Sequence, residues 1–186
     1  MRIIAGTAKN RKLNLPKGVK IRSTLNKVKE ALFSILGEYV QGREVLDLFA
    51  GSGALGIEAL SRGAKSATFV DNNPHLIRAI GENLKNLDFT GRSVVLDLDA
   101  PRAVEYLEAE NKKFDLILTD PPYGMANIVL KSLTESDILK NCFVIVVEHY
   151  KKDILAARET GLKRVKLARY GDTMLSFYKD KSECKK

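Results

Sequence analysis

A tetrapeptide, Asp120-Pro121-Pro122-Tyr123, has the residue types that a reaction at an aromatic amine requires. The lone pair of such an amine is delocalised into its ring, so the nitrogen is a poor nucleophile. The Asp120 carboxylate and the Pro121 carbonyl can accept its two N–H groups, and the Tyr123 ring can stack on the base, a contact that contributes about 1–3 kcal/mol elsewhere. The two prolines force a rigid turn. The pattern predicts that the amine acts as a positioned nucleophile in an in-line attack. The base that carries this amine must leave its stack to reach the turn.

A glycine-rich loop precedes this turn in the chain. Gly51, Gly53 and Gly56 satisfy the pattern GxGxxG, and Asp71 follows Gly51 by 20 residues, which taken literally predicts NAD binding. Asp47, four residues before the loop, argues against NAD, because a carboxylate there would repel a pyrophosphate. The same carboxylate would suit a cationic ligand. The loop therefore favours a cationic cofactor over a dinucleotide.

The elements that position both motifs alternate along the chain. Continuous apolar runs predict buried parallel strands at 45–49, 67–70, 94–98, 114–118 and 143–147. Helices are expected at 54–63, 74–88, 100–111, 126–134 and 151–160. This alternation predicts a doubly wound α/β fold. Two last runs, 163–170 and 173–179, are separated only by Gly171-Asp172, so an antiparallel hairpin is expected at the sheet edge.

Positive charge is concentrated at the start of the chain. The formal net charge is +8, and residues 1–29 contain nine Lys or Arg and no acidic residue, so the rest has a net charge of −1. Such an arm is typical of polyanion binding, although simple solvation is an alternative for a residue such as Lys27. The arm is expected to end in a helix that begins at Ser23 or Thr24 and stops at Gly42.

Several classes of protein do not fit the composition. No apolar run approaches the ~20 residues that span a bilayer, and the N-terminus lacks a signal-peptide core, so no membrane partner is expected. The two cysteines lack CxxC spacing, and His75 and His149 are isolated, so no metal site is predicted. The chain fits one domain of a cytoplasmic protein.

Two motifs resemble those of known enzymes. The D-x-F-x-G-x-G loop is similar to the cofactor-binding motif of class I S-adenosylmethionine-dependent methyltransferases, whose cofactor carries an ammonium and a sulfonium. The DPPY turn is similar to the (D/N)PP(Y/F) motif of methyltransferases that act on base amines, or in some cases on glutamine. The arm adds R-I-I-x-G at 2–6, R-x-T at 22–24 and V-(R/K)-E-x-L-F at 28–33. Together these motifs resemble the RsmD-type family of 16S rRNA guanine-N2-methyltransferases over essentially the whole chain.

The arm departs from that family at four positions. Ala5 and Asn10 stand where the family usually has Gly, Ser23 where it has Pro, and Lys29 where it has Arg. The resemblance implies a Rossmann-like class I fold with a mostly parallel seven-stranded sheet, an antiparallel C-terminal hairpin and a small basic extension. It divides the chain into an RNA-binding arm and helix (1–42), a methyltransferase domain (43–180) and a frayed tail (181–186).

The resemblance also implies a reaction and its residues. A monomer would transfer a methyl group from S-adenosylmethionine, without a metal, to N2 of a flipped guanine in 16S rRNA or the small ribosomal subunit; the family's site is guanine 966. S-Adenosylhomocysteine is the product. Asp71 would bind the ribose, Asp47 would lie near the methionine part and Asp99 would contact the adenine, although Asp71 and Asp99 could instead only cap the helices that follow. The full cofactor set is Asp47, Phe49, Gly51, Ser52, Gly53, Asp71, Asn72, Asp99 and Ala100, and the catalytic set is Asp120, Pro121, Pro122 and Tyr123. The RNA contacts would be Arg2, Arg11, Lys12, Arg22, Thr24 and Lys29.

Two other functions remain open at this point. The same pocket could serve an adenine-N6 or other nucleic-acid amine methyltransferase. A non-catalytic RNA-binding assembly factor that kept the fold is a third reading. The intact set of Asp47, the glycine loop, Asp71 and DPPY argues against a pure binding module, which would need none of them.

Overall fold

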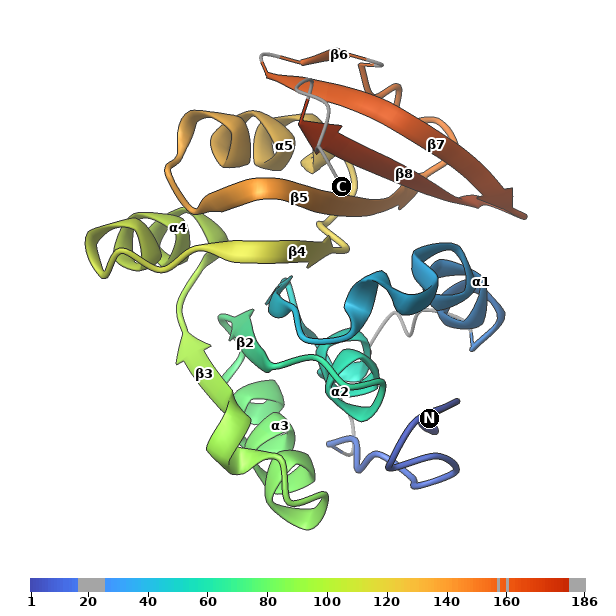
Figure 1. Cartoon of the computed structure of the whole chain (residues 1–186), viewed down its shortest axis with the longest axis vertical. Helices are drawn as coiled ribbons and strands as arrows, with labels where there is room; N and C mark the ends of the chain where they lie inside the picture. Colours follow the sequence, from blue (N-terminus) through green and yellow to red (C-terminus); the bar gives the residue numbers. More distant parts are fainter. Residues whose placement is uncertain (17–25, 157, 160, 181–186) are drawn as a thin grey trace.

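A computed structural model describes residues 1–16, 26–156, 158–159 and 161–180, and shows a sheet between two layers of helices (Figure 1). The sheet has the strand order β3-β2-β1-β4-β5-β8-β7-β6. Its strands are β1 Glu44–Leu48, β2 Ser66–Asp71, β3 Ser93–Asp97, β4 Phe114–Thr119, β5 Leu139–Tyr150, β6 Arg158–Glu159, β7 Leu162–Tyr170 and β8 Thr173–Asp180. Strands β1 to β5 are parallel, and β8 lies antiparallel between β5 and β7. The predicted fold class and C-terminal hairpin are confirmed; β6, with two residues, adds a short eighth strand.

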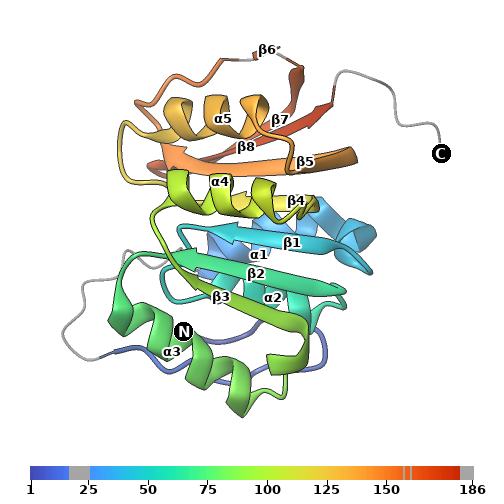
Figure 2. The ribbon, with the colours of Figure 1, turned by 90° about the vertical axis from the view of Figure 1, so that its left-hand side faces the viewer.

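The helices cover the two faces of the sheet unequally. They are α1 Asn26–Leu36, α2 Ala54–Ser61, α3 Pro74–Asn86, α4 Ala100–Ala109 and α5 Ala126–Glu135, with 3-10 turns at Gly37–Val40 and Thr90–Arg92. Helices α4 and α5 lie on one face, and α1, α2, α3 and the N-terminal arm lie on the other (Figure 2). The predicted cap residues Ser23 and Thr24 fall outside the described residues. None of the described helices is long and apolar enough to cross a membrane.

The starts of α3 and α4 show which polar residues act as caps. The Asn73 side chain accepts the backbone N–H of His75, and the Asp99 side chain accepts that of Arg102, at 3.0 Å in both cases. Asp99 therefore caps α4, which was the alternative to an adenine contact that the sequence left open for this residue. Asp71 does not cap α3, because Asn73 takes that position.

The predicted helix over 151–160 is wrong for the described part of that segment. Residues 151–156 contain no helix, and β6 occupies 158–159. The backbone carbonyls of Ile154, Leu155 and Ala156 accept side-chain donors instead of helical N–H groups. The donors are Asn127 Nδ2 (3.1 Å), the Arg164 guanidinium (2.9 Å) and the Tyr178 hydroxyl (2.7 Å). These tertiary hydrogen bonds satisfy the carbonyls without a helix, which local periodicity could not reveal.

The N-terminal arm is attached to the body by one buried carboxylate. Glu58 of α2 has no exposed surface. Its two oxygens accept the backbone N–H groups of Ile4 (2.8 Å) and Ala5 (3.0 Å) from the arm. The Lys29 ammonium of α1 lies 2.9 Å from the same carboxylate, and the Arg62 guanidinium lies at 2.9 Å. One side chain therefore joins the arm, α1 and α2.

Lys29 is not an RNA contact in this structure, which corrects the sequence-based prediction. Its side chain is 0% exposed, and its ammonium also donates to the Arg2 carbonyl at 2.8 Å. A phosphate could not reach it without opening the core. The arm itself contributes Ile3, Ala8 and Leu13 to the same hydrophobic cluster as α1 and α2, so it shares a core with the body.

Replacing Glu58 with Gln would leave the Lys29 ammonium buried beside a neutral amide. We expect Glu58→Gln to lower the free energy of unfolding by about 3–5 kcal/mol, the usual cost of breaking a buried ion pair. Denaturant titration measures this change. Lys113→Gln is a matched control, because it removes an ion pair with Asp137, whose side chain is 77% exposed. That variant should lose less than about 1 kcal/mol; equal losses in both variants would contradict the role given to Glu58.

Candidate functional site

The candidate site lies where the strand order reverses. β1 is flanked by β2 on one side and β4 on the other, and the chain crosses to opposite faces of the sheet after these two strands. Ligands of open α/β sheets bind outside the carboxyl ends of the strands at such a point. The ends of β1, β2, β3 and β4 here lead into the glycine loop, Asp71, Asp99 and the DPPY turn, respectively. The topology thus brings the two sequence motifs to one edge.

Two carboxylates hold the glycine loop in shape. Asp47 Oδ2 accepts the backbone N–H of Gly56 at 2.8 Å, and Asp71 Oδ2 accepts that of Gly51 at 2.8 Å. Gly56 must be glycine for space: a Cβ at this position would lie 2.3 Å from Cε1 of Phe69. Side chains of β1 and β2 therefore hold the loop in shape before any ligand binds.

Asp47 is buried under the loop. It is 2% exposed and does not line the cavity described below. Burial raises the pKa of Asp47 to about 7; the Gly56 hydrogen bond lowers it, and the nearby charges of Asp71 and Asp120 raise it further. The carboxyl is thus placed to change its protonation near neutral pH. The expectation that it lies near the methionine part of a cofactor stays a prediction.

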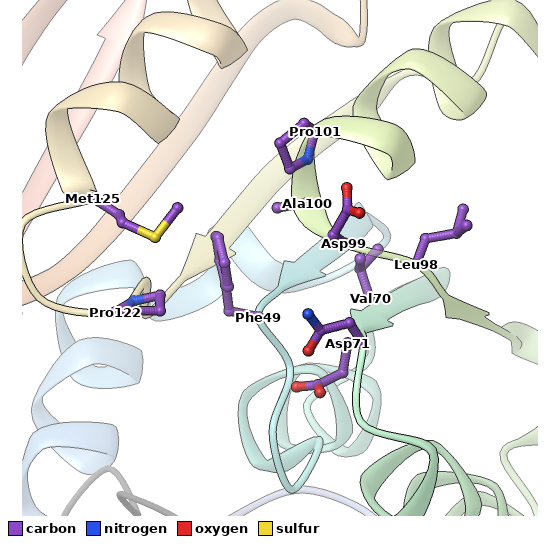
Figure 3. Close-up of a pocket in the computed structure, with 10 residues that line it drawn as sticks. Phe49, Val70, Asp71, Leu98, Asp99, Ala100, Pro101, Pro122 and Met125 are labelled. Carbon is purple, nitrogen blue, oxygen red and sulfur yellow. The ribbon is translucent and has the colours of Figure 1, made fainter.

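A cavity of about 190 Å³ opens beside the glycine loop (Figure 3). It is lined by Phe49, Val70, Asp71, Asn72, Leu98, Asp99, Ala100, Pro101, Pro122 and Met125. Six of these belong to the predicted cofactor and catalytic sets: Phe49, Asp71, Asn72, Asp99, Ala100 and Pro122. The predicted residues Gly51, Ser52, Gly53, Asp120, Pro121 and Tyr123 do not line it.

Four lining residues were missed by the sequence reasoning. Val70 and Leu98 lie at strand ends directly before predicted acidic residues, so their position was a usable signal. Pro101 and Met125 lie at the starts of α4 and α5, and only the packing of these helices brings them to the cavity. They add an apolar wall to a site that the motifs described mainly through polar groups.

The cavity has the groups that an adenosine would need. Phe49, Pro101 and Met125 form apolar sides around it (Figure 3). Asp71 accepts the N–H groups of Gly51 and Asn73, at 2.8 and 2.9 Å, which leaves about two of its four lone-pair positions for hydroxyl groups. The Asp99 side chain is 43% exposed and retains acceptor capacity beyond its helix cap. These residues fit an adenosine-containing cofactor.

Phe49 occupies a strained backbone conformation at this site. Its φ is +67°, in the left-handed region that bulky residues rarely adopt. Such a conformation costs on the order of 1–3 kcal/mol and persists only when the surroundings impose it. Here the next residue, Ala50, donates its N–H to the Val70 carbonyl at 2.8 Å. In this conformation the Phe49 side chain lines the cavity.

The DPPY turn lies directly beside the cavity. Pro122 lines the cavity and its carbonyl accepts the Met125 N–H at 3.1 Å, while Pro121 is buried. Tyr123 is 62% exposed. Its ring meets that of Tyr150 edge to face, with centroids 5.3 Å apart and an interplanar angle of 77°. Tyr150, at the end of β5, is a further residue of the site that the sequence motifs did not identify.

The predicted RNA-binding residues of the arm have different environments. Arg2 is exposed and donates to the Asn10 carbonyl at 2.8 Å, and Arg11 is exposed and donates to the Asn86 carbonyl at the end of α3, also at 2.8 Å. Lys12 is exposed and pairs through its backbone with Arg2. Arg22 and Thr24 lie outside the described residues. Both arginines are thus held in place by the fold while their side chains stay exposed.

No cluster of three or more His, Cys, Asp or Glu within the described ranges could hold a metal ion. His149 is buried, and its Nε2 lies 3.0 Å from the Ser176 hydroxyl. Burial lowers the pKa of His149. His75 is exposed at the start of α3.

Known proteins resemble the chain over nearly its full length. A family model described as "Conserved hypothetical protein 95" matches residues 1–179. YlbH of Bacillus subtilis, provisionally named as an rRNA methyltransferase, is 38% identical over 181 residues, which are 96% of this chain and 98% of YlbH. Ribosomal RNA small subunit methyltransferase D of Escherichia coli is 33% identical over 150 residues, 80% of this chain and 74% of that protein. A solved structure of yhhF from Escherichia coli, provisionally named as a methyltransferase, has a TM-score of 0.86 at 28% identity and covers 98% of this chain and 99% of its own.

Asp47 should make the stability of the protein fall as the pH rises. The folded chain keeps the Asp47 proton until about pH 7, whereas an unfolded chain loses it near 3.8. Between these values the folded state binds more protons, so the free energy of unfolding decreases with pH by up to about 1.4 kcal/mol per unit. Asp47→Asn should remove this contribution. Denaturant titrations from pH 5 to 7.5 measure it, with the exposed Asp137→Asn as control; parallel pH profiles for wild type and Asp47→Asn would contradict the assignment.

Proposed function

We propose a reaction for this chain, which belongs to the family described as conserved hypothetical protein 95, the RsmD-type ribosomal RNA methyltransferases. The proposed reaction transfers a methyl group from S-adenosylmethionine to N2 of a guanine in 16S rRNA, at the position that the family resemblance implies. One observation carries the proposal. The DPPY turn borders the same cavity as Asp71 and Asp99. A site for the amine that accepts the methyl group and a site for the cofactor's nucleoside would therefore share one edge of the sheet.

The cofactor would occupy the cavity through residues of three strands. Asp71 would accept the ribose hydroxyls, Asp99 would accept the adenine amine, and Phe49 would pack against the adenine ring. The cofactor supplies an electrophilic methyl group on a sulfonium. The braced backbone of the glycine loop would approach the methionine part, with Asp47 beneath it as a carboxylate that favours positive charge.

The substrate amine would lie at the DPPY turn. The Asp120 carboxylate and the Pro121 carbonyl would accept its two N–H groups, which frees the nitrogen lone pair from conjugation with the base. Attack of this nitrogen on the methyl group would form the N–C bond as the methyl–sulfur bond breaks, and Asp120 would pass the proton that the amine loses to solvent. Catalysis would rest on positioning and electrostatics.

Tyr123 would hold the flipped base by stacking. Its ring is 62% exposed, so the base could stack on it, and the edge-to-face contact with Tyr150 would restrict the orientation of the ring. A base in this position must leave its stack in the RNA. The arm, with Arg2, Arg11 and Lys12 exposed, would bind the surrounding phosphates.

The identity of the modified base is tested by nucleoside analysis. Purified protein with labelled S-adenosylmethionine should methylate 16S rRNA or small subunits that lack the mark, and digestion should release N2-methylguanosine. This base is expected because the arm motifs resemble those of guanine-N2 enzymes. N6-methyladenosine in place of N2-methylguanosine would favour the adenine alternative, and no incorporation into RNA would favour the assembly factor.

Asp120→Ala should reduce kcat by at least about 100-fold, because the amine loses an acceptor and its proton loses a route to solvent. Binding of S-adenosylhomocysteine, measured by calorimetry, should change less than about twofold, since Asp120 does not line the cofactor cavity. Asp137→Ala on the surface should leave both quantities unchanged. Loss of cofactor binding together with turnover would instead assign Asp120 a structural role.

A further inference from the structure

A second basic region lies far from the N-terminal arm in the sequence. Residues 150–180 contain eight basic and four acidic residues, whereas residues 30–149 contain 11 basic and 18 acidic ones. The near-neutral body is therefore an acidic part followed by a basic one. Strand β7 alone carries Lys163, Arg164, Lys166 and Arg169 and no acidic residue.

Several surface cations elsewhere in the body are neutralised by ion pairs, whereas no ion pair is found within the described residues for the exposed Arg78, Lys85, Arg92 and Lys112. Lys65, Lys113, Lys131 and Lys140 all have a carboxylate partner within 3.7 Å. Among the described residues after β5, no ion pair is found for Lys152, Lys166 or Arg169, and all three are exposed. Asp172, which pairs with Lys151, lies close enough to Lys152 and Arg169 for their charges to lower its pKa, after the larger effect of Lys151, so these two cations share one carboxylate that already has a partner.

The turn of the β7–β8 hairpin lies at the catalytic edge. The first residue of β8, Thr173, pairs with Tyr150, the last residue of β5. The Lys151 N–H donates to the Asp172 carbonyl at 2.9 Å, which joins the segment after β5 to the hairpin turn. Tyr150 in turn contacts Tyr123 of the DPPY motif. The turn of the hairpin is thus on the same side of the sheet as the site (Figure 1).

Besides Lys151, which pairs with Asp172 at 2.7 Å, two more cations flank this turn. Lys152 follows β5, and Arg169 lies one residue before the end of β7, with its Nε donating to the Gly171 carbonyl at 3.0 Å. That hydrogen bond orients the guanidinium, and no other hydrogen bond of its N–H groups is found within the described part of the chain. β4 and β7 are three strand spacings apart in the sheet, about 14 Å, so these cations lie within a few nucleotides of a base at the DPPY turn.

We propose that Lys152 and Arg169 bind the phosphate backbone of the RNA strand that flanks the target base, on the opposite side of the site from the N-terminal arm. The inference rests on the proposed function, because it takes RNA as the substrate. The arm lies beyond α2 and α3 at the β3 side of the sheet, and the hairpin forms the other end. RNA would therefore contact the protein at both ends of the catalytic edge.

A simpler role for these cations is protection of a sheet edge. β6 pairs only with Leu162 and Lys163, so the rest of β7 is an edge among the described strands. Lysines on edge strands prevent pairing with another chain. If the cations only protect the edge, the effect of removing one should not depend on its distance from the DPPY turn. If they bind RNA, removing a cation near the turn should weaken RNA binding more than removing a distant one.

Lys152→Gln/Arg169→Gln is compared with Lys163→Gln/Lys179→Gln. The second pair removes the same charge from the opposite end of the hairpin, where Lys163 and Lys179 are exposed and paired in register. Lys163 lies six residues from Arg169, about 20 Å along the strand and well beyond the screening length of about 8–10 Å. Binding to a 16S rRNA fragment and to small subunits is measured at several salt concentrations, together with S-adenosylhomocysteine binding, melting temperature and sedimentation.

The Lys152→Gln/Arg169→Gln variant should bind RNA more weakly. The slope of log K against log salt should decrease by about 1.4–1.8, since each phosphate contact contributes about 0.7–0.9. Cofactor binding, melting temperature and the control variant's slope should match the wild type. An unchanged slope, an equal decrease in the control, or self-association with unchanged RNA affinity would overturn the inference alone. A wild type that does not bind RNA would overturn the proposed function as well.

Discussion

The buried carboxylate of Glu58 is the constraint on which the arrangement of this protein depends. Removing a charge from water is costly unless every acceptor position is used, and Glu58 uses its two oxygens for two backbone N–H groups and two cations. Its partners come from the arm, from α1 and from α2 itself. Because α2 begins at the glycine loop, the arm and the proposed cofactor site are attached to the same short helix.

The same chemistry recurs at the site itself. Asp47 and Asp71 each use a carboxylate oxygen to hold a backbone N–H of the glycine loop or the helix behind it. This preorganises the loop, but it also places Asp47, Asp71 and Asp120 close enough to raise the pKa of Asp47. A cationic cofactor would relieve that repulsion. The three neighbouring carboxyl groups therefore have an electrostatic cost that the proposed ligand would offset.

The distribution of charge complements this view. The residues from 30 to 149, which form the site, are acidic, and basic residues lie in the arm and in the C-terminal hairpin. An RNA strand would be repelled from the centre of such a surface and attracted to its two ends. Under the proposed function, a single flipped and uncharged base could still approach the DPPY turn between them. In that case the distribution of charge would favour a base over a phosphate at the DPPY turn.

The sequence by itself determined the parts of this protein that depend on local patterns. Apolar runs located β1 to β5, glycine spacing located the loop, and the two prolines of DPPY located the turn after β4, because each of these signals acts within a few residues. The boundaries of α2 to α5 were also close to those observed. Asp71 and Asp99 could be placed at one edge because parallel strands end on the same side of a sheet.

Only the tertiary structure decided the roles that depend on distant partners. A lysine in an amphipathic helix is usually exposed, yet Lys29 is buried in an ion pair with the carboxylate of Glu58. Residues 151–156 have the composition of a helix, yet Asn127, Arg164 and Tyr178 satisfy their carbonyls. Tyr150 and Met125 join the site through strand and helix packing, and the antiparallel register of β8 brings the turn of the hairpin to the same edge of the sheet. Burial and hydrogen-bond partners contributed from far along the chain set these outcomes, and neither quantity is contained in a local window of sequence.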